Sequence, residues 1–153
     1  MVMKKQNETT SFGVIGLGRF GSALVKTLAE AGKEVIAVDK SEQAVKAVRK
    51  YTDFAFVVDS LSQETLEETG IQNCNTVTIC IGEAIDMRVL TTMLVIKMGI
   101  PHVISKATST EHGEVLKRLG ATVVYPESDM AVRIGKRLIS GNLIDYISLD
   151  DDT

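Results

Sequence analysis

A glycine-rich turn between a short apolar strand and a helix constrains this chain more than any other feature. Residues 12–21 place glycines in the pattern Gly-x-Gly-x-x-Gly. In this pattern Gly16 permits a tight turn, Gly18 leaves room for a phosphate beside the backbone, and Gly21 lets the helix pack closely on the strand. The start of a helix also offers N–H groups and a positive dipole end to an anion. The turn therefore predicts that a nucleotide phosphate binds here.

Strand and helix patterns alternate along the rest of the chain. We expect strands at residues 12–15, 34–38, 54–58, 76–81, 102–105 and 122–125, and helices at residues 19–31, 41–50, 62–69, 85–98, 110–119 and 128–140. Continuously apolar strands suit a parallel sheet covered on both faces, and right-handed crossovers then give the strand order 3-2-1-4-5-6. The predicted fold is an α/β, Rossmann-type, doubly wound six-stranded parallel sheet. The last helix has no strand to return to, so we assign it to an interface.

The size of the chain limits its domain organisation. With 153 residues, of which 44% are hydrophobic and 24% charged, it can build one good core but not two sizeable domains. We expect a flexible N-terminus over residues 1–10, one nucleotide-binding domain over residues 11–140, and a linker over residues 141–153. Residues 142–149 resemble the opening of a further element, so we expect the chain to be one module of a longer protein.

Charge and hydropathy exclude several classes of protein. A net charge of −3 and an isoelectric point near 5.4 give no basic surface for nucleic acid. Lys4 and Lys5 precede polar residues rather than an apolar stretch, so nothing resembles a secretory signal and we expect a cytoplasmic protein. The most apolar stretch, residues 89–98, is far shorter than the roughly 20 residues that span a bilayer. Membrane association would therefore come through a partner.

The reactive side chains do not form a catalytic or metal-binding pattern. Cys74 and Cys80 form neither a Cys-x-x-Cys pair nor a cluster with His102 and His112, which predicts buried, inert thiols rather than a disulfide or a zinc site. The sequence places neither a nucleophile nor a carboxylate as a catalytic partner for either histidine. No Gly-Lys-Ser/Thr loop for phosphoryl transfer is present. We therefore expect a binding protein and not an enzyme.

Two charged residues beside the glycine turn are candidate nucleotide ligands. Asp39 ends the second expected strand, where a carboxylate can accept hydrogen bonds from both ribose hydroxyls and would repel a 2′-phosphate. This favours NAD, NADH, ATP or ADP over NADP; the alternative is an aspartate that only flanks the next helix. Arg19 lies inside the turn, where its guanidinium can fold onto a terminal phosphate. The alternative is an exposed arginine without a partner.

Further candidates follow the other strands. Asp59 and Ser60 either contact adenine or only start a helix. Lys106 either approaches phosphate or a neighbouring subunit, or is solvated. Glu127 either shares a divalent ion with the phosphates or is an ordinary first-turn glutamate. The remaining candidates adjoin these positions: Phe20, Lys40 and Gly82.

Several motifs agree in order and spacing with one family. They are Val-Ile-Gly-Leu-Gly-Arg-Phe-Gly, Val-Asp after strand two, Ile-Gly after strand four, Ser-Lys-Ala after strand five and Tyr-Pro-Glu-Ser-Asp-Met-Ala-Val after strand six. Together they resemble the KTN/RCK (TrkA-N) regulatory domain of potassium uptake systems and channels, with the cytoplasmic KtrA-type subunit as the nearest likeness. The resemblance covers about residues 11–149.

The resemblance implies a regulatory subunit that binds adenine nucleotides, namely ATP, ADP, NAD or NADH. Such subunits form homodimers that assemble into an octameric ring, dock on the cytoplasmic side of a membrane-embedded potassium transporter subunit, and gate it by changing shape. It also implies roles for single residues: a phosphate turn at Gly16, Gly18 and Gly21, distal phosphate at Arg19, ribose at Asp39, adenine at Asp59 and Ser60, and Mg²⁺ or Ca²⁺ at Glu127. The final helix resembles the family's dimer crossover.

Two other functions suit the same fold. One is a redox sensor that reports the ratio of NADH to NAD. The other is a fragment of an NAD-dependent oxidoreductase whose catalytic domain lies beyond Thr153. The missing acid–base residues and the arginine in the glycine turn argue against the oxidoreductase, whereas the sequence does not separate the redox sensor from an ATP sensor.

Overall fold

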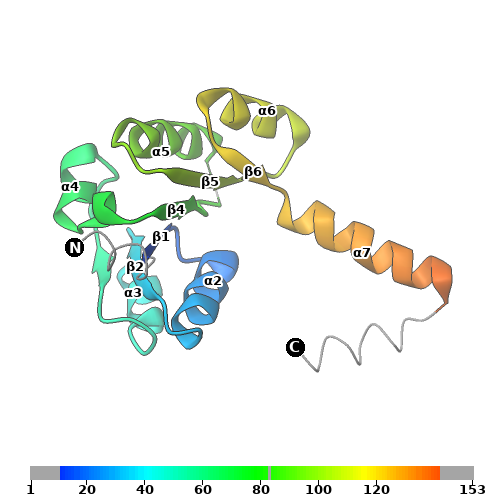
Figure 1. The fold of residues 1–153 in the computed structure, drawn as a ribbon, viewed down its shortest axis with the longest axis horizontal. Helices are drawn as coiled ribbons and strands as arrows, with labels where there is room; N and C mark the ends of the chain where they lie inside the picture. The colour runs from blue at the N-terminus through cyan, green and yellow to red at the C-terminus, as the bar shows by residue number, and fades with distance from the viewer. Residues whose placement is uncertain (1–10, 83, 142–153) are drawn as a thin grey trace, which may run out of the picture.

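A six-stranded parallel sheet forms the centre of the molecule (Figure 1). The computed structural model describes residues 11–82 and 84–141, so the predictions for residues 1–10 and 142–153 lie outside the described residues. The sheet has the order β3-β2-β1-β4-β5-β6, which confirms the predicted doubly wound topology. Its strands are β1 Ser11–Ile15, β2 Glu34–Asp39, β3 Ala55–Val57, β4 Thr76–Ile79, β5 His102–Lys106 and β6 Thr122–Val124.

Helices cover both faces of the sheet. Figure 1 shows α2 and α3 on one side and α5 and α6 on the other, with α7 extending away from the sheet. The described helices are α2 Arg19–Glu30, α3 Glu42–Val48, α4 Gln63–Glu68, α5 Ile85–Lys97, α6 Thr110–Leu119 and α7 Pro126–Ser140, together with a 3-10 turn at Ile71–Asn73.

Successive residues of the central strand explain why the strands are apolar throughout. Val14 and Ile15 of β1 are both buried but point to opposite faces, because side chains alternate along a strand. Val14 belongs to the core cluster that contains Val25 of α2. Ile15 belongs to the cluster that contains Leu66 of α4 and Val95 of α5. Successive residues of the central strand therefore meet a helix layer on one face or the other.

The helix boundaries follow local hydrogen bonding. Ser41 and Ser62, the first residues of two predicted helices, are N-caps, and each accepts a hydrogen bond from the backbone N–H three residues later. The predicted start of the last helix at residue 128 was wrong, because α7 begins at Pro126. A proline suits the first position of a helix, since its fixed φ is helical and its missing N–H would have no partner there. Likewise β4 ends at Ile79, two residues before the predicted end.

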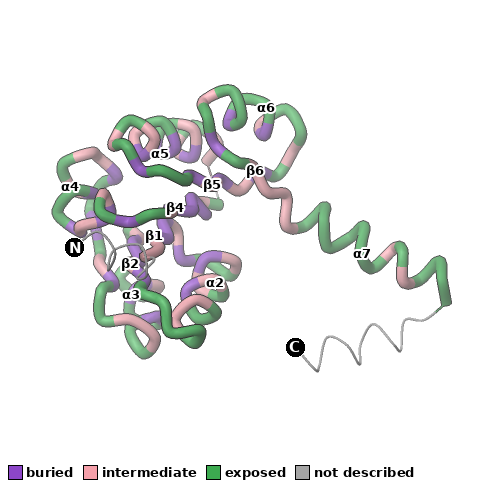
Figure 2. Tube along the Cα trace, in the orientation of Figure 1, coloured by how far each residue is buried: buried purple, intermediate pink, exposed green. Residues whose placement is uncertain are grey.

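Helix α7 is exposed over most of its length (Figure 2). It contains no buried residue, whereas the sheet and its covering helices supply the core. At its start, the hydroxyl of Tyr125 lies against Gly113 of α6, where a Cβ would collide with it. Several large apolar side chains of α7 are exposed: Met130, Val132, Ile134, Leu138 and Ile139. Among the helices of the described ranges, none is long and apolar enough to cross a membrane.

Candidate functional site

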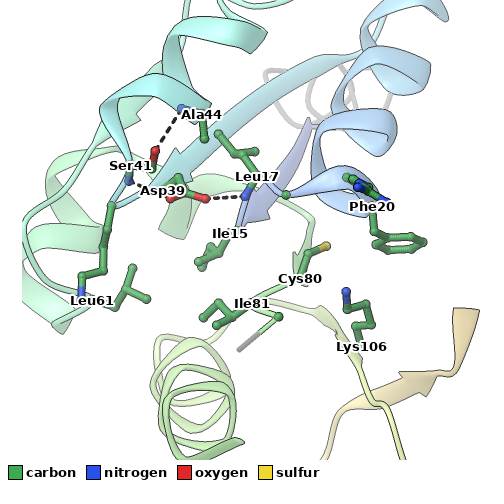
Figure 3. Close-up of a pocket in the computed structure, with 15 residues that line it drawn as sticks. Ile15, Leu17, Phe20, Asp39, Ser41, Ala44, Leu61, Cys80, Ile81 and Lys106 are labelled. Carbon is green, nitrogen blue, oxygen red and sulfur yellow. Dashed lines mark hydrogen bonds between the residues drawn. The ribbon is translucent and has the colours of Figure 1, made fainter. Parts of the chain in front are cut away.

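A cavity of about 670 Å³ opens where four parallel strands end (Figure 3). It lies at the carboxyl ends of β1, β2, β4 and β5, on both sides of the point where the strand order reverses. In open α/β sheets, ligands bind at this switch point. The lining residues are Ile15, Gly16, Leu17, Gly18, Arg19, Phe20, Asp39, Lys40, Ser41, Ala44, Leu61, Cys80, Ile81, Gly82 and Lys106.

Two of the three motif glycines serve close packing. Gly16 has a φ of +101° and donates its N–H to the Val38 carbonyl at 2.9 Å. A Cβ there would lie 2.8 Å from backbone atoms of Cys80 and Ile81, so the turn presses directly on the end of β4. Gly21 is buried, and a Cβ on it would collide with the carbonyl oxygen of Gly16. These two positions hold α2, β1 and β4 together.

Gly18 differs from its neighbours because the space beside it is open. A Cβ on Gly18 would meet nothing within 4 Å. Gly18 is the N-cap of α2; it offers no side-chain hydrogen bond, and the first turn of the helix carries no acidic residue. The first N–H groups of α2 therefore have no capping side chain, and their positive dipole end adjoins the cavity. This combination suits a phosphate group.

Asp39 combines a structural role with a place in the cavity wall. One carboxylate oxygen accepts the N–H of Leu17 at 2.6 Å, and the other accepts the N–H of Ser41 at 2.8 Å. The side chain thus connects the glycine turn with the start of α3. A carboxylate has about four lone-pair positions, so acceptor capacity is left for a ligand. The alternative, in which Asp39 only flanks α3, explains its hydrogen bond with Ser41 but not its hydrogen bond with Leu17.

The charged residues of the cavity wall are mainly cations. Among the described residues that line it, Arg19, Lys40 and Lys106 are cations and Asp39 is the carboxylate. The ammonium of Lys106 lies 5.6 Å from the centroid of the Phe20 ring, within the range of a cation–π contact. Figure 3 shows these two side chains facing each other at one side of the cavity, with Leu61 at the opposite side. An anionic ligand fits this charge distribution.

Four of the predicted site residues do not line this cavity. Gly21 is buried behind the glycine turn. Asp59 lines a neighbouring pocket of about 610 Å³, which shares Lys40 with the first. Ser60 is exposed and lies 3.4 Å from the Thr65 hydroxyl, and it lines neither pocket. Glu127 is exposed in the first turn of α7 and also lines neither pocket.

The metal role of Glu127 stays a prediction. Within residues 11–82 and 84–141, no group of three or more histidine, cysteine, aspartate or glutamate side chains comes together to hold a metal ion. Divalent ions such as Mg²⁺ take several oxygen ligands, often including substrate phosphates. Glu127 therefore needs ligands from a nucleotide or from another copy of the chain.

Sequence reasoning missed several lining residues. Ser41 and Ala44 were identified only as parts of a helix. Cys80 was predicted only as a buried thiol at the end of a strand, and Ile81 only as part of a family motif there. Leu61 is buried and follows Asp59-Ser60 after β3.

The two thiols are buried, as predicted, and neither forms a disulfide. Burial raises the pKa of Cys80 to about 12, with Lys106 opposing the shift. Burial also raises the pKa of Cys74 to about 11; a hydrogen bond with Ser11 opposes this, and the charge of Glu34 adds to it. Cys80 lines the cavity, but as a protonated thiol it is a small apolar contact rather than a nucleophile.

Comparison with known proteins places the chain in one family. The family model described as the TrkA-N domain matches residues 12–126. The chain is 38% identical over 151 residues to Ktr system potassium uptake protein C of Bacillus subtilis, covering 98% of this chain and 66% of that protein. It is 39% identical over 142 residues to Ktr system potassium uptake protein A of the same organism, covering 92% and 64%. The chain thus spans no more than 66% of the length of these relatives.

Solved structures support the same fold. The crystal structure of GsuK bound to ADP is 22% identical, with a TM-score of 0.70 over 87% of this chain and 35% of that one. The GsuK channel bound to NAD is 23% identical, with a TM-score of 0.70 over 90% and 25%. The family resemblance read from the motifs is confirmed, and the chain belongs to the TrkA-N domain family.

Proposed function

We propose that this chain is the nucleotide-binding domain of a cytoplasmic regulatory subunit for a membrane-embedded potassium transporter or channel. It binds an adenine nucleotide, ATP or ADP, or else NAD or NADH, and catalyses no reaction. One observation carries the proposal: a single cavity unites the uncapped start of α2, two cations at Arg19 and Lys106, and the carboxylate of Asp39. The potassium uptake proteins named above support the transport role.

The cavity suggests one placement of the ligand. The ribose hydroxyls donate to the free lone pairs of Asp39, at the end of β2. The first phosphates accept from the N–H groups at the start of α2, beside Gly18. The distal phosphates then lie over β4 and β5, near Arg19 and Lys106. Adenine extends the other way, past Leu61 and toward Asp59 and Ser60, and the remaining predicted contacts are Phe20, Lys40 and Gly82.

Gating requires the nucleotide to bind two shapes of the assembly with different affinity. Moving a two-state equilibrium from 1:99 to 99:1 needs about 5.5 kcal/mol of differential binding. A single contact between Arg19 and a γ-phosphate is too weak for this. Equivalent sites in a homodimer, and in a ring of eight subunits built from such dimers, together supply the required differential binding free energy. The exposed apolar side chains of α7 provide the dimer surface, and Glu127 at its start completes a Mg²⁺ or Ca²⁺ site on the nucleotide phosphates.

The greater length of the relatives supports the proposed domain organisation. Residues 11–140 form the nucleotide-binding lobe, and residues 141–153 lead into a second lobe. The ligand-sensing step then belongs to the part of the protein described here. Docking on the transporter belongs to the assembled full-length subunit.

Calorimetric titration of ligand-stripped protein tests the proposal. ATP, ADP, NAD and NADH are each titrated with and without Mg²⁺, while light scattering reports the mass of the assembly. Tighter binding of ATP than of ADP, together with a large oligomer, supports the gating function. Binding of NAD or NADH alone to a small species would instead favour the redox sensor or the dehydrogenase fragment.

A further inference from the structure

A buried arginine stands directly behind the cavity wall. Arg88 belongs to the first turns of α5, and only 2% of it is exposed. Its Nε donates to the carbonyl of Ile81 at 2.9 Å, and its Nη2 donates to the carbonyl of Gly82 at 3.1 Å. Both carbonyls belong to the segment that follows β4, and both residues line the cavity. The guanidinium is therefore one hydrogen bond away from the cavity wall.

Within residues 11–82 and 84–141, the hydrogen bonds of Arg88 go to neutral carbonyls and not to a carboxylate. Its Nη1 is buried and has no hydrogen-bond partner in the described part of the chain. The partners of Nε and Nη2 are neutral carbonyls, and burial lowers the pKa of the guanidinium. An arginine nevertheless stays protonated in proteins. Burying a charge among neutral partners costs stability, so packing within the described part of the chain gives no reason for an arginine at this position.

The strand order explains what such a charge can act on. A nucleotide whose ribose binds Asp39 on β2 and whose first phosphate binds beside Gly18, after β1, directs its next phosphates toward β4. Gly16 also packs against the backbone of Cys80 and Ile81, so the glycine turn and the end of β4 are held together. The segment that Arg88 holds therefore faces the distal phosphates. A charge within a poorly polarisable interior is screened less than one at the surface.

We propose that Arg88 is a positioning residue of the nucleotide site, which fixes the segment after β4 and adds a buried positive charge behind the distal phosphates. The inference rests on the proposed nucleotide-binding function. Under this proposal Arg88 determines which nucleotide the site prefers, because the gain in affinity from its charge grows with the number of phosphates that reach β4. Arg88 itself does not touch the ligand.

The test compares AMP, ADP and ATP on the wild-type chain and on Arg88→Met, by calorimetry at a temperature where both are folded. A charge about 10 Å from the distal phosphates, at an effective dielectric constant of about 20, changes a binding constant by roughly tenfold. We expect Arg88→Met to weaken ATP binding by about that factor, to weaken ADP less, and to leave AMP within about threefold. Arg118→Met on the exposed face of α6 makes the same change in net charge and should alter none of the three.

A second variant without the charge keeps the inference testable if Arg88→Met does not fold. Arg88→Gln keeps an amide that can still donate to a carbonyl of the segment, and the same graded loss is expected. An equal loss of AMP, ADP and ATP, or no loss, would show that Arg88 only stabilises the fold and would overturn the inference. If the wild-type chain binds none of AMP, ADP and ATP, the inference is overturned; the proposed function fails as well only if the chain also binds neither NAD nor NADH.

Discussion

Gly18 and Gly21 should respond in opposite ways to the same small change. Both become alanine by the addition of one methyl group, and both lie in the glycine turn. The methyl group on Gly18 enters open space beside the cavity, whereas the one on Gly21 collides with the carbonyl oxygen of Gly16. The first substitution therefore probes the ligand site, and the second probes the packing of α2.

The expected size of each effect follows from the local structure. Gly18 has φ −74° and ψ −157°, which alanine can adopt. Alanine is a worse N-cap than glycine by about 1 kcal/mol, but it lowers the entropy of the unfolded chain by about 0.4–1 kcal/mol. The free energy of unfolding of Gly18→Ala should thus stay within about 1 kcal/mol of wild type. Gly21→Ala should lose roughly 3 kcal/mol, because overpacking against backbone cannot be relieved by a rotamer.

Two measurements test this pair. Urea unfolding without ligand gives the stability of each variant, and calorimetry gives the affinity for ATP and NAD. We expect Gly18→Ala to bind both nucleotides at least tenfold more weakly, a loss of about 1.4 kcal/mol, because the methyl group occupies the place of a phosphate oxygen. Wild-type affinity in Gly18→Ala, or a loss of stability equal to that of Gly21→Ala, would refute this account of the turn.

Three further outcomes follow from the site. Arg19→Ala should lose the preference for ATP over ADP and keep the fold; an equal loss of both ligands in calorimetry would contradict contact with the γ-phosphate. Asp39→Ala should weaken every adenosine ligand alike and lower the free energy of unfolding by about 2–3 kcal/mol, since two backbone N–H groups lose an ionised acceptor; unchanged affinity would remove its ribose role. Burial keeps the Cys80 thiol protonated in the folded chain, with a pKa of about 12, whereas an unfolded thiol ionises near pH 9. The stability that comes from this raised pKa is complete below pH 9 and is lost as the pH rises toward 12, by up to about 1.4 kcal/mol per pH unit. In urea unfolding, the free energy of unfolding of Cys80→Ala should therefore fall less steeply between pH 9 and 10.5 than that of the wild-type chain.

Local patterns were sufficient to predict most of the fold. The glycine turn, the serine caps and the alternation of apolar segments are each local signals, and together with the crossover rule they gave the observed strand order. The start of α7 was placed two residues too late because Pro126 was assigned to the connection between strand and helix rather than to the first position of the helix. A proline suits both places, and only tertiary structure distinguishes them.

The candidate site was predictable where a residue lies at the carboxyl end of a strand. Asp39 and Lys106 are such residues, because parallel strands bring their carboxyl ends to one edge of the sheet. Arg88 was not predictable, since nothing in a helical sequence indicates that a side chain turns back to bind the carbonyls of the preceding segment. Leu61 also needed the tertiary structure, because its burial depends on the packing of α4 against the sheet.

Helix α7 buries none of its residues against the rest of the described chain. An isolated helix of about 15 residues is only marginally stable in water, so its helicity depends on whatever covers its apolar side. Anything that binds only the folded helix stabilises it by mass action. The helix content of residues 126–140 should therefore rise with protein concentration, and far-ultraviolet circular dichroism over a dilution series would then report self-association without any label.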